Sequence, residues 1–272
     1  MATKKPNSRQ HGQALKIPLK GVNRALDVLE YVATHPGRAT DIANGLKIPW
    51  PTLHRTISQL EAKGFLRKDR VTNFFTIGPR MWLIGTSYLS SHETLEIARP
   101  YLDSTAEKYP YTLQMCESSG HFSVVLFSHN HMGEEITKAA LGFHFPLHCG
   151  SKGQVLLAYM GEEAIDDYLS KNLKALTPNT ITDPDELREV LTAIRLDGYR
   201  ATSGDVQSFT ASIATPIFNR TGAVIASLCF ISQRSTFRDQ EEVALALEAL
   251  QRISNNISVA VGWKPGKSVH TP

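Results

Sequence analysis

The chain has 272 residues, of which 42% are hydrophobic and 20% are charged, and its formal net charge at pH 7 is +3. This balance is typical of a globular protein with room for two domains, and it excludes a chain that is disordered throughout. No run approaches the roughly 18 apolar residues of a membrane span, and no signal-peptide pattern is present, so we expect a cytoplasmic protein with no membrane partner. The three cysteines form no CxxC pair, which argues against a disulfide framework or a zinc ribbon.

The charge is divided unevenly along the chain. Residues 1–80 contain 14 lysines and arginines against 5 aspartates and glutamates, whereas the remaining residues contain 15 against 21. A basic amino-terminal part attracts nucleic acid, and an acidic remainder does not. Residues 1–17 are polar and basic without periodicity, which predicts a disordered arm.

Three helices are predicted between residues 18 and 65. The second, at residues 40–46, is followed by a tight turn and by a third at residues 48–65, which has prolines at its start and Gly64 at its end. A helix, a tight turn and a second helix form a helix-turn-helix. The first helix, which ends before residues 35–37, has apolar positions at helical spacing: Val22, Ala25, Leu26, Leu29, Val32 and Ala33.

The third predicted helix suits contact with DNA. Leu53, Ile57 and Leu60 form one apolar stripe, whereas the opposite side carries hydrogen-bond donors and one fixed cation, Arg55. Because that side has no carboxylate, a polyanion approaches it without like-charge repulsion. An ordinary solvated helix face is the alternative when the helix is considered alone. The predicted DNA contacts on the second and third helices are Thr40, Trp50, Thr52, His54, Arg55, Ser58 and Gln59.

Two strand-like runs follow at residues 65–68 and 73–77, and a short turn joins them. Arg67, Lys68 and Arg70 make this hairpin a basic wing, so residues 18–78 are predicted to form a winged helix-turn-helix DNA-binding domain. The order of residues 48–55, 60–66 and 75–78 resembles the DNA-binding half of the IclR-type transcriptional regulators. Trp50 departs from the family pattern, where a small or basic residue is more usual. It is interpreted as a core anchor or a groove contact, and its position at the helix start favours packing.

A further helix is predicted from Pro79 to about residue 90, with apolar residues on more than one face. The family resemblance implies that residues 79–92 are a linker helix, which joins the domains and pairs with its counterpart in a dimer. A helix buried within one domain is the alternative. Another helix is predicted at residues 93–108, with Pro100 causing a kink or a fresh start.

Residues 93–262 are predicted to form an α+β domain, with residues 263–272 as a tail. Hairpins beside segregated helices indicate an antiparallel sheet with flanking helices. The last helix is expected to bury Val243, Leu247, Leu250, Ile253 and Ile257. The predicted strands lie at residues 111–117, 122–128, 134–141, 212–218 and 223–231, and the helices at residues 153–160, 162–170, 184–196 and 239–261.

This second half resembles the effector-binding domain of the IclR-type regulators, which is similar in fold to the GAF domains. Residues 146–158, 198–205 and 212–219 match the family's signature segments, although Gln154 stands where lysine is common and Lys152 lies two places earlier. The resemblance implies an effector pocket with an apolar wall of Phe143, Thr210 and Ile231. The other implied pocket residues are Ser151, Lys152, Thr202, Asp205, Ser212 and Cys229.

A helix start beside a lysine favours an anion, so we expect a small carboxylate as the effector. Cys229 and Ile231, where family members can have serines, favour a less polar acid, for which an aromatic acid is one candidate. The expected function is a ligand-responsive regulator, a repressor or an activator, that binds a double-stranded DNA operator of a catabolic operon as a homodimer or homotetramer. A winged helix that binds protein instead of DNA is the alternative, against which the basic charge of the first 80 residues argues.

Enzyme and metal sites are not expected. The sequence has no GxSxG, P-loop or GxGxxG motif, so we predict neither an enzyme nor a cofactor. Four histidines and a cysteine raise the hypothesis of a zinc site, but no HExxH helix is present, and Pro146 disrupts the helix that a pair at positions 144 and 148 would need. We therefore expect no metal site at His129, His131, His144, His148 and Cys149, and we expect the histidines to lie on the surface and in loops.

Overall fold

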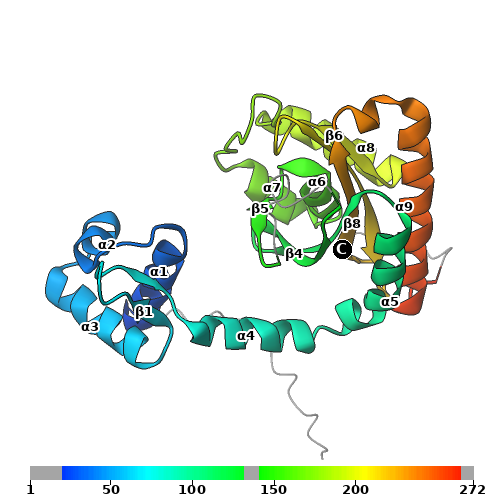
Figure 1. Ribbon diagram of the computed structural model, residues 1–272. Helices are drawn as coiled ribbons and strands as arrows, with labels where there is room; N and C mark the ends of the chain where they lie inside the picture. The colour runs from blue at the N-terminus through cyan, green and yellow to red at the C-terminus, as the bar shows by residue number, and fades with distance from the viewer. Residues whose placement is uncertain (1–19, 132–140, 265–272) are drawn as a thin grey trace, which may run out of the picture. The chain divides into compact units, whose positions relative to one another are not determined.

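The computed structural model describes residues 20–131 and 141–264 (Figure 1). The chain divides into two compact units, and the division falls between Ser91 and His92. The predicted arm at residues 1–17, almost all of the predicted strand at residues 134–141 and most of the predicted tail lie outside the described residues. Within the described residues, no helix has both the length and the apolarity needed to cross a membrane.

The first unit is a winged helix-turn-helix, as predicted. Its three helices each bury one stripe against a common core that also takes in both wing strands; the buried residues include Val28, Val32, Ile42, Leu53, Ile57, Leu60, Leu66 and Phe75. In chain order the elements are α1 (Lys20–Thr34), α2 (Ala39–Leu46), α3 (Trp50–Ala62), β1 (Leu66–Lys68), β2 (Phe75–Ile77) and α4 (Pro79–Ser90).

The buried stripe of α1 is narrower than predicted. Val22 and Leu26 are 53% and 52% exposed, and Ala33 is also exposed, whereas Val28 and Val32 are buried. The apolar residues of α1 extend around more than one side of the helix, and the small core of this unit contacts only one of those sides. The helical assignment was therefore right, but the predicted core face was partly wrong.

The end of α3 and the start of α4 meet at two glycines. Gly64 has φ of +77°, which ends the helix, and a β-carbon added to Gly78 would lie 2.3 Å from the Gly64 carbonyl oxygen. This close approach brings β1 and β2 together in antiparallel register, with Leu66 opposite Ile77 and Lys68 opposite Phe75. The wing is therefore held at a defined position against α3.

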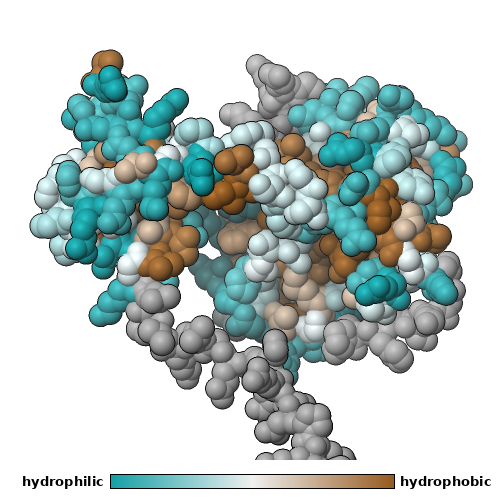
Figure 2. Space-filling model, turned by 90° about the horizontal axis from the view of Figure 1, so that it is seen from below, coloured by the Kyte–Doolittle hydropathy of each residue, from teal (hydrophilic) through white to brown (hydrophobic). Residues whose placement is uncertain are grey.

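Helix α4 has no buried residue within the first unit. Trp82, Leu83 and Ile84 are 70%, 55% and 51% exposed, so the alternative of a helix buried within one domain is wrong for this structure. Figure 2 shows the first unit as mostly hydrophilic, with separate hydrophobic patches on its surface.

Within its described residues, the second unit is built on one antiparallel six-stranded sheet in the order β5-β4-β3-β8-β7-β6. This confirms the α+β prediction. The strands β5 and β6 were not predicted, because each has only three or four residues. The elements are α5 (Glu93–Lys108), β3 (Thr112–Ser119), β4 (Phe122–His129), β5 (His144–Pro146), α6 (Gly150–Ala158), α7 (Glu162–Leu169), α8 (Pro184–Asp197), β6 (Arg200–Ser203), β7 (Thr210–Phe218), β8 (Val224–Gln233), a 3₁₀ turn (Thr236–Arg238) and α9 (Gln240–Ala260).

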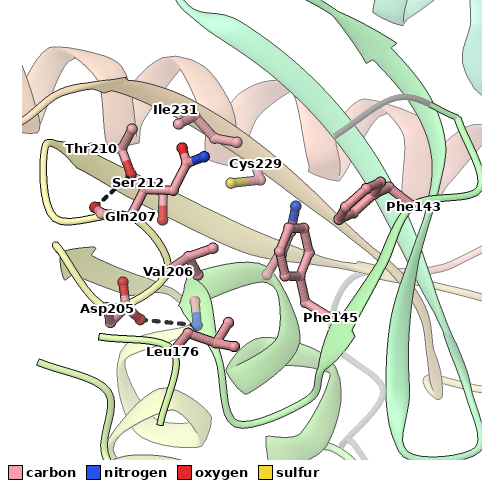
Figure 3. Close-up of a pocket in the computed structure, with 12 residues that line it drawn as sticks. Phe143, Phe145, Leu176, Asp205, Val206, Gln207, Thr210, Ser212, Cys229 and Ile231 are labelled. Atoms are coloured by element: carbon pink, nitrogen blue, oxygen red, sulfur yellow. Dashed lines mark hydrogen bonds between the residues drawn. The ribbon is translucent and has the colours of Figure 1, made fainter. Parts of the chain in front are cut away.

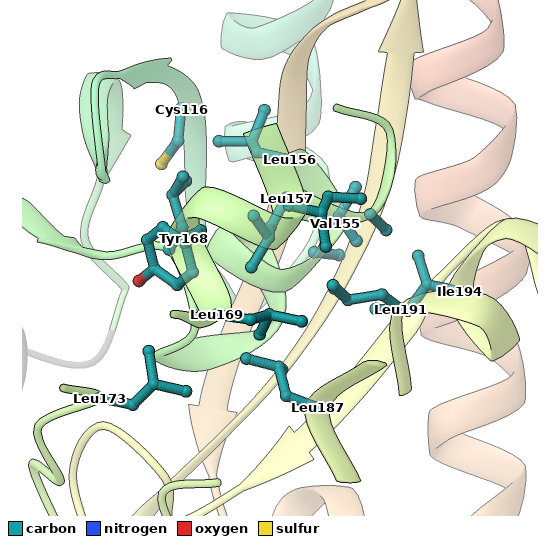
Figure 4. Close-up of a cluster of buried hydrophobic side chains, with 14 of the residues drawn as sticks. Cys116, Val155, Leu156, Leu157, Tyr168, Leu169, Leu173, Leu187, Leu191 and Ile194 are labelled. Atoms are coloured by element: carbon teal, nitrogen blue, oxygen red, sulfur yellow. The ribbon is translucent and has the colours of Figure 1, made fainter. Parts of the chain in front are cut away.

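Helices cover both faces of this sheet (Figure 1). On β8, Phe230 points to the face covered by α5 and α9, where its ring centroid lies 4.9 Å from that of Tyr111. The neighbouring Cys229 points to the opposite face and contacts Ser151 on α6. The core on the α6 side includes Leu157, Leu169 and Leu187 from α6, α7 and α8 (Figure 4). The two faces of the sheet therefore belong to two separate layers of packing.

Three helices differ from the prediction. Helix α9 buries Ala246, Ala249, Leu250, Ile253 and Ile257, whereas the predicted core residues Val243 and Leu247 are only partly buried. Helix α6 begins at Gly150, three residues before the predicted start, and α5 continues through Pro100 without a fresh start. A small residue suits a helix that lies close to a sheet, which is why α9 buries alanines that a pattern of large apolar residues overlooks.

Candidate functional site

The outer side of α3 carries the side chains that the sequence predicts as DNA contacts. His54, Arg55, Ser58 and Gln59 are exposed, whereas Thr52 is partly buried. The remaining predicted contact on the helices, Thr40, is exposed on α2. The burial of Leu53, Ile57 and Leu60 on the inner side turns this polar side outward.

Trp50, the first residue of α3, does not pack in the core. Its side chain is 48% exposed, and its ring centroid lies 5.8 Å from that of His54, one turn along the helix. The expectation that favoured a packing role is therefore wrong. The indole lies on the same exposed part of the helix as the predicted groove contacts.

The wing exposes Arg67, Lys68 and Arg70. Lys68 lies over the Phe75 ring at 5.7 Å from its centroid, while the Asp69 carboxylate accepts hydrogen bonds from the backbone N–H groups of Val71 and Thr72. The bonds from Thr72 are the main cause of the lowered pKa of Asp69. Asp69 therefore organises the turn, and the cationic side chains around it remain open to solvent.

The second unit contains a cavity of about 330 Å³ at the start of α6 (Figure 3). We call it the Lys152 cavity. It lies on the α6 side of the sheet, between β7 and β8 and the loops that carry Leu176 and Asp205. The lining residues are Phe143, Phe145, Gly150, Lys152, Leu176, Asp205, Val206, Gln207, Thr210, Ser212, Cys229 and Ile231.

Seven of the nine predicted effector residues line this cavity: Phe143, Lys152, Asp205, Thr210, Ser212, Cys229 and Ile231. Ser151 and Thr202 do not line it, but each is hydrogen bonded to Ser212, at 2.8 and 3.0 Å between hydroxyl oxygens. Sequence reasoning missed Phe145, which is two residues from Phe143 on the short strand β5. It also missed Gly150, Leu176, Val206 and Gln207, and for the three in loops no sequence pattern indicates which way the loop folds.

Lys152 is the cation of the cavity lining, and it is only 4% exposed. Its ammonium donates a hydrogen bond of 2.6 Å to the Gln114 Oε1 atom and lies 4.8 Å from the centroid of the Phe145 ring. Both of these partners are neutral. Across residues 20–131 and 141–264, no carboxylate forms an ion pair with Lys152.

Asp205 is the carboxylate of the lining, and it serves the start of α6. Its Oδ2 atom accepts a 2.9 Å hydrogen bond from the Gly150 N–H, and its side chain is 7% exposed. Gly150 has φ of +83°, a conformation that favours glycine. The first amide of α6 therefore already has an anionic acceptor, so the prediction that the helix start binds an anion needs correction: the Lys152 side chain is what remains to attract one.

Ser212, which lines the cavity, belongs to a cluster of hydroxyl groups that extends behind the lining. The Ser212 hydroxyl joins those of Ser151 and Thr202, and Ser151 lies 3.6 Å from the Cys229 sulfur. Burial raises the pKa of Cys229 to about 12, so its thiol stays neutral at physiological pH. The hydroxyl row can both donate and accept hydrogen bonds, whereas Cys229 contributes an unreactive, weakly polar wall.

The loops that carry Leu176 and Asp205 are tied to the rest of the second unit by buried polar contacts. His148 Nδ1 lies 2.7 Å from the Tyr168 hydroxyl, and His148 Nε2 lies 3.1 Å from the Lys174 carbonyl oxygen. The Thr180 hydroxyl donates to the Asp205 carbonyl at 2.6 Å. His148 thus has a structural role, and among the described residues no group of three or more His, Cys, Asp and Glu side chains is arranged to hold a metal ion.

Acidification is expected to destabilise the second unit through His148. Burial lowers the pKa of His148 below its ordinary value of 6.5, so the neutral ring stabilises the fold above pH 6.5 and this stabilisation is lost as the pH falls through the lower folded-state value. Urea unfolding between pH 7.5 and 5 measures the effect, which can reach about 1.4 kcal/mol per pH unit. His148→Gln should flatten the dependence, and the exposed His129→Gln should not; equal slopes in wild type and His148→Gln would contradict this.

Comparison with known proteins agrees with the geometry of both units. The family model for the IclR helix-turn-helix domain matches residues 21–70, and the model for the bacterial transcriptional regulator IclR C-terminal domain matches residues 86–259. The chain belongs to the IclR family. It is thus an IclR-family transcriptional regulator with a helix-turn-helix and an effector-binding domain.

Similar IclR-family proteins extend over nearly the whole chain. The HTH-type transcriptional repressor AllR of Klebsiella pneumoniae is 25% identical over 263 residues, covering 96% of this chain and 94% of that protein. The transcriptional repressor IclR of Escherichia coli strain K12 is 25% identical over 244 residues, covering 87% of this chain and 89% of that protein. Both are repressors by name.

Solved IclR structures share the fold. An IclR regulator from Alicyclobacillus acidocaldarius has a TM-score of 0.77 at 25% identity and covers 90% of this chain and 100% of its own. An IclR homologue from Microbacterium hydrocarbonoxydans, solved in complex with 4-hydroxybenzoate, has a TM-score of 0.73 at 25% identity and covers 89% of this chain and 98% of its own.

Proposed function

We propose that this IclR-family regulator binds a small organic acid in the Lys152 cavity and in response changes its affinity for a double-stranded DNA operator of a catabolic operon. The observation that carries the proposal is Lys152 itself. Its ammonium is almost fully buried beside an open cavity, and its described partners are an amide oxygen and an aromatic ring. A buried charge is costly unless an opposite charge accompanies it, and a bound carboxylate would supply that charge.

The walls of the cavity favour an acid with an aromatic body. Phe143 and Phe145 lie side by side with ring centroids 5.2 Å apart, and Ile231, Leu176 and Val206 add apolar surface. A flat apolar ligand can pack on such rings. The 4-hydroxybenzoate bound by the Microbacterium homologue supports this class of effector for the present protein.

The proposed DNA-binding surface is the outer side of α3 together with the wing. We assign base or phosphate contacts to Trp50, Thr52, His54, Arg55, Ser58 and Gln59 on α3, with Thr40 on α2 and Arg67, Lys68 and Arg70 on the wing. In domain terms, we propose residues 18–78 as the DNA-binding domain, 79–92 as the linker and 93–262 as the effector-binding domain.

For this function the protein is proposed to act as a homo-oligomer, either a dimer or a tetramer. Trp82, Leu83 and Ile84 expose a large apolar surface on α4, which a second copy of the helix could cover. Two-fold pairing would place the reading helices at half-sites about 10 base pairs apart or a multiple of that. Analytical ultracentrifugation tests the assembly, and a monomer at the concentration that gives full operator binding would contradict it.

The test of the proposed function is a pair of titrations on the full chain. Calorimetry with benzoate, 4-hydroxybenzoate, short aliphatic acids and neutral sugars should show binding of at least one acid and of no sugar. Fluorescence anisotropy with a labelled operator should then show an affinity shift of about 5- to 150-fold when that acid is added, because a typical allosteric coupling is about 1 to 3 kcal/mol. Selective binding of a neutral sugar would refute the assignment of an acid.

A further inference from the structure

Lys152 is partnered by a residue that neither the sequence motifs nor the family signature segments include. Gln114 lies on β3, is fully buried, and directs its side chain to the α6 side of the sheet, where its Oε1 accepts the 2.6 Å hydrogen bond from Lys152. Its Nε2 donates to the Ser128 hydroxyl on β4 at 3.3 Å. Because an ammonium can only donate, this contact requires the amide oxygen, and not the nitrogen, to face Lys152.

The amide differs from a carboxylate of the same shape in one respect. Glutamate at position 114 would reach the same ammonium with the same number of atoms and would cancel its charge, as buried lysine and carboxylate pairs do. Glutamine satisfies one ammonium donor and leaves the full positive charge in place. Among the described lining residues, Asp205 carries a carboxylate, but it is hydrogen bonded to the start of α6 and forms no ion pair with Lys152.

We infer that Gln114 is the specificity-determining residue of the Lys152 cavity: it holds the Lys152 ammonium in place without neutralising it, so that the cavity selects an anionic ligand over a neutral one of the same shape. This inference rests on the proposed function, since it concerns the ligand of the same cavity. The inference goes beyond the proposed function because the residue that determines the selectivity for charge, Gln114, lies outside the cavity lining and contacts the cation from behind.

The experiment compares acids with their primary amides, which have nearly the same shape but no charge. The probes are benzoate with benzamide, 4-hydroxybenzoate with 4-hydroxybenzamide, and hexanoate with hexanamide, each titrated calorimetrically into the full-length protein. Wild type should bind at least one acid more tightly than its amide. In Gln114→Glu that acid should lose about 100-fold in affinity, because a carboxylate with the same charge as the ligand now lies beside the ammonium. The affinity for the amide should fall by less than about threefold.

The matched control is Gln233→Glu, which makes the same change of charge at an exposed position on β8 outside the cavity lining. Its acid-over-amide ratio should equal that of wild type. A Gln114→Glu protein that keeps the wild-type ratio would overturn the inference while leaving the proposed function in place. A wild type that binds operator but none of the acids would instead overturn the proposed effector class.

A second variant covers the case in which Gln114→Glu does not fold. Gln114→Leu removes the hydrogen-bond acceptor that holds the Lys152 ammonium in place, so the preference for the acid over its amide should fall below that of wild type. A Gln114→Leu protein that keeps the wild-type preference would show that the amide does not position the ammonium, and it would overturn the inference.

Discussion

Arg55→Ala is expected to lower operator affinity by about 5- to 150-fold, the loss that corresponds to one good base contact of about 1 to 3 kcal/mol. Arg55 lies in the middle of the exposed side of α3, on the opposite side of the helix from the buried Leu53, Ile57 and Leu60. Its removal disturbs no packing, so the circular dichroism spectrum and melting temperature should stay close to those of wild type. Fluorescence anisotropy with operator and with scrambled DNA measures the loss.

Two comparisons make the result for Arg55 specific. Arg67→Ala and Lys68→Ala in the wing should weaken operator and scrambled DNA alike and reduce the salt slope by about one unit per contact, because phosphate contacts carry no base information. Arg99→Ala, an exposed arginine on α5 in the second unit, should change neither affinity. If Arg55→Ala left operator affinity at the wild-type value, α3 would not be the reading helix.

Lys152→Met is expected to abolish the response to the acid. Its affinity for the acid should fall by at least about 30-fold, because truncating one partner of a buried charge pair costs about 2 to 5 kcal/mol or more. The substitution keeps an unbranched side chain against the Phe145 ring and removes the charge. Operator affinity without acid should remain within about twofold of wild type, because Lys152 belongs to the second unit and lies outside the proposed DNA-binding surface.

The matched control for Lys152 is Lys108→Met, which removes an exposed cation on α5 that is not part of the cavity lining. It should keep both the acid affinity and the operator response. Asp205→Ala is a poor choice for this test, since the Asp205 carboxylate holds the first amide of α6 and its loss would disturb the helix that positions Lys152. Undiminished acid affinity in Lys152→Met would show that the acid binds elsewhere.

Local patterns in the sequence predicted the helix-turn-helix well, because its signals lie within a few residues of one another. Prolines at the start of α3, Gly64 at its end and an apolar stripe at helical spacing each act over one or two turns. The same kind of signal predicted the turn of the β7–β8 hairpin and the start of α8 at Pro184. In each case the residues that determine the conformation are neighbours in the chain.

The sequence by itself determined most of the elements, the division of charge and most of the residues that gather at the cavity, but only the tertiary structure decided what each side chain contacts. Trp50 is exposed, Val22 lies outside the core, and the Asp205 carboxylate is hydrogen bonded to the start of α6. Each of these environments depends on how elements distant in the sequence pack together, which no local pattern predicts. Gln114 lies 38 positions from Lys152 in the chain, and the antiparallel sheet and the packing of α6 on it bring the two to hydrogen-bonding distance. Such long-range contacts determine whether a buried charge is stabilised and which ligand it attracts, because its free energy depends on every group around it.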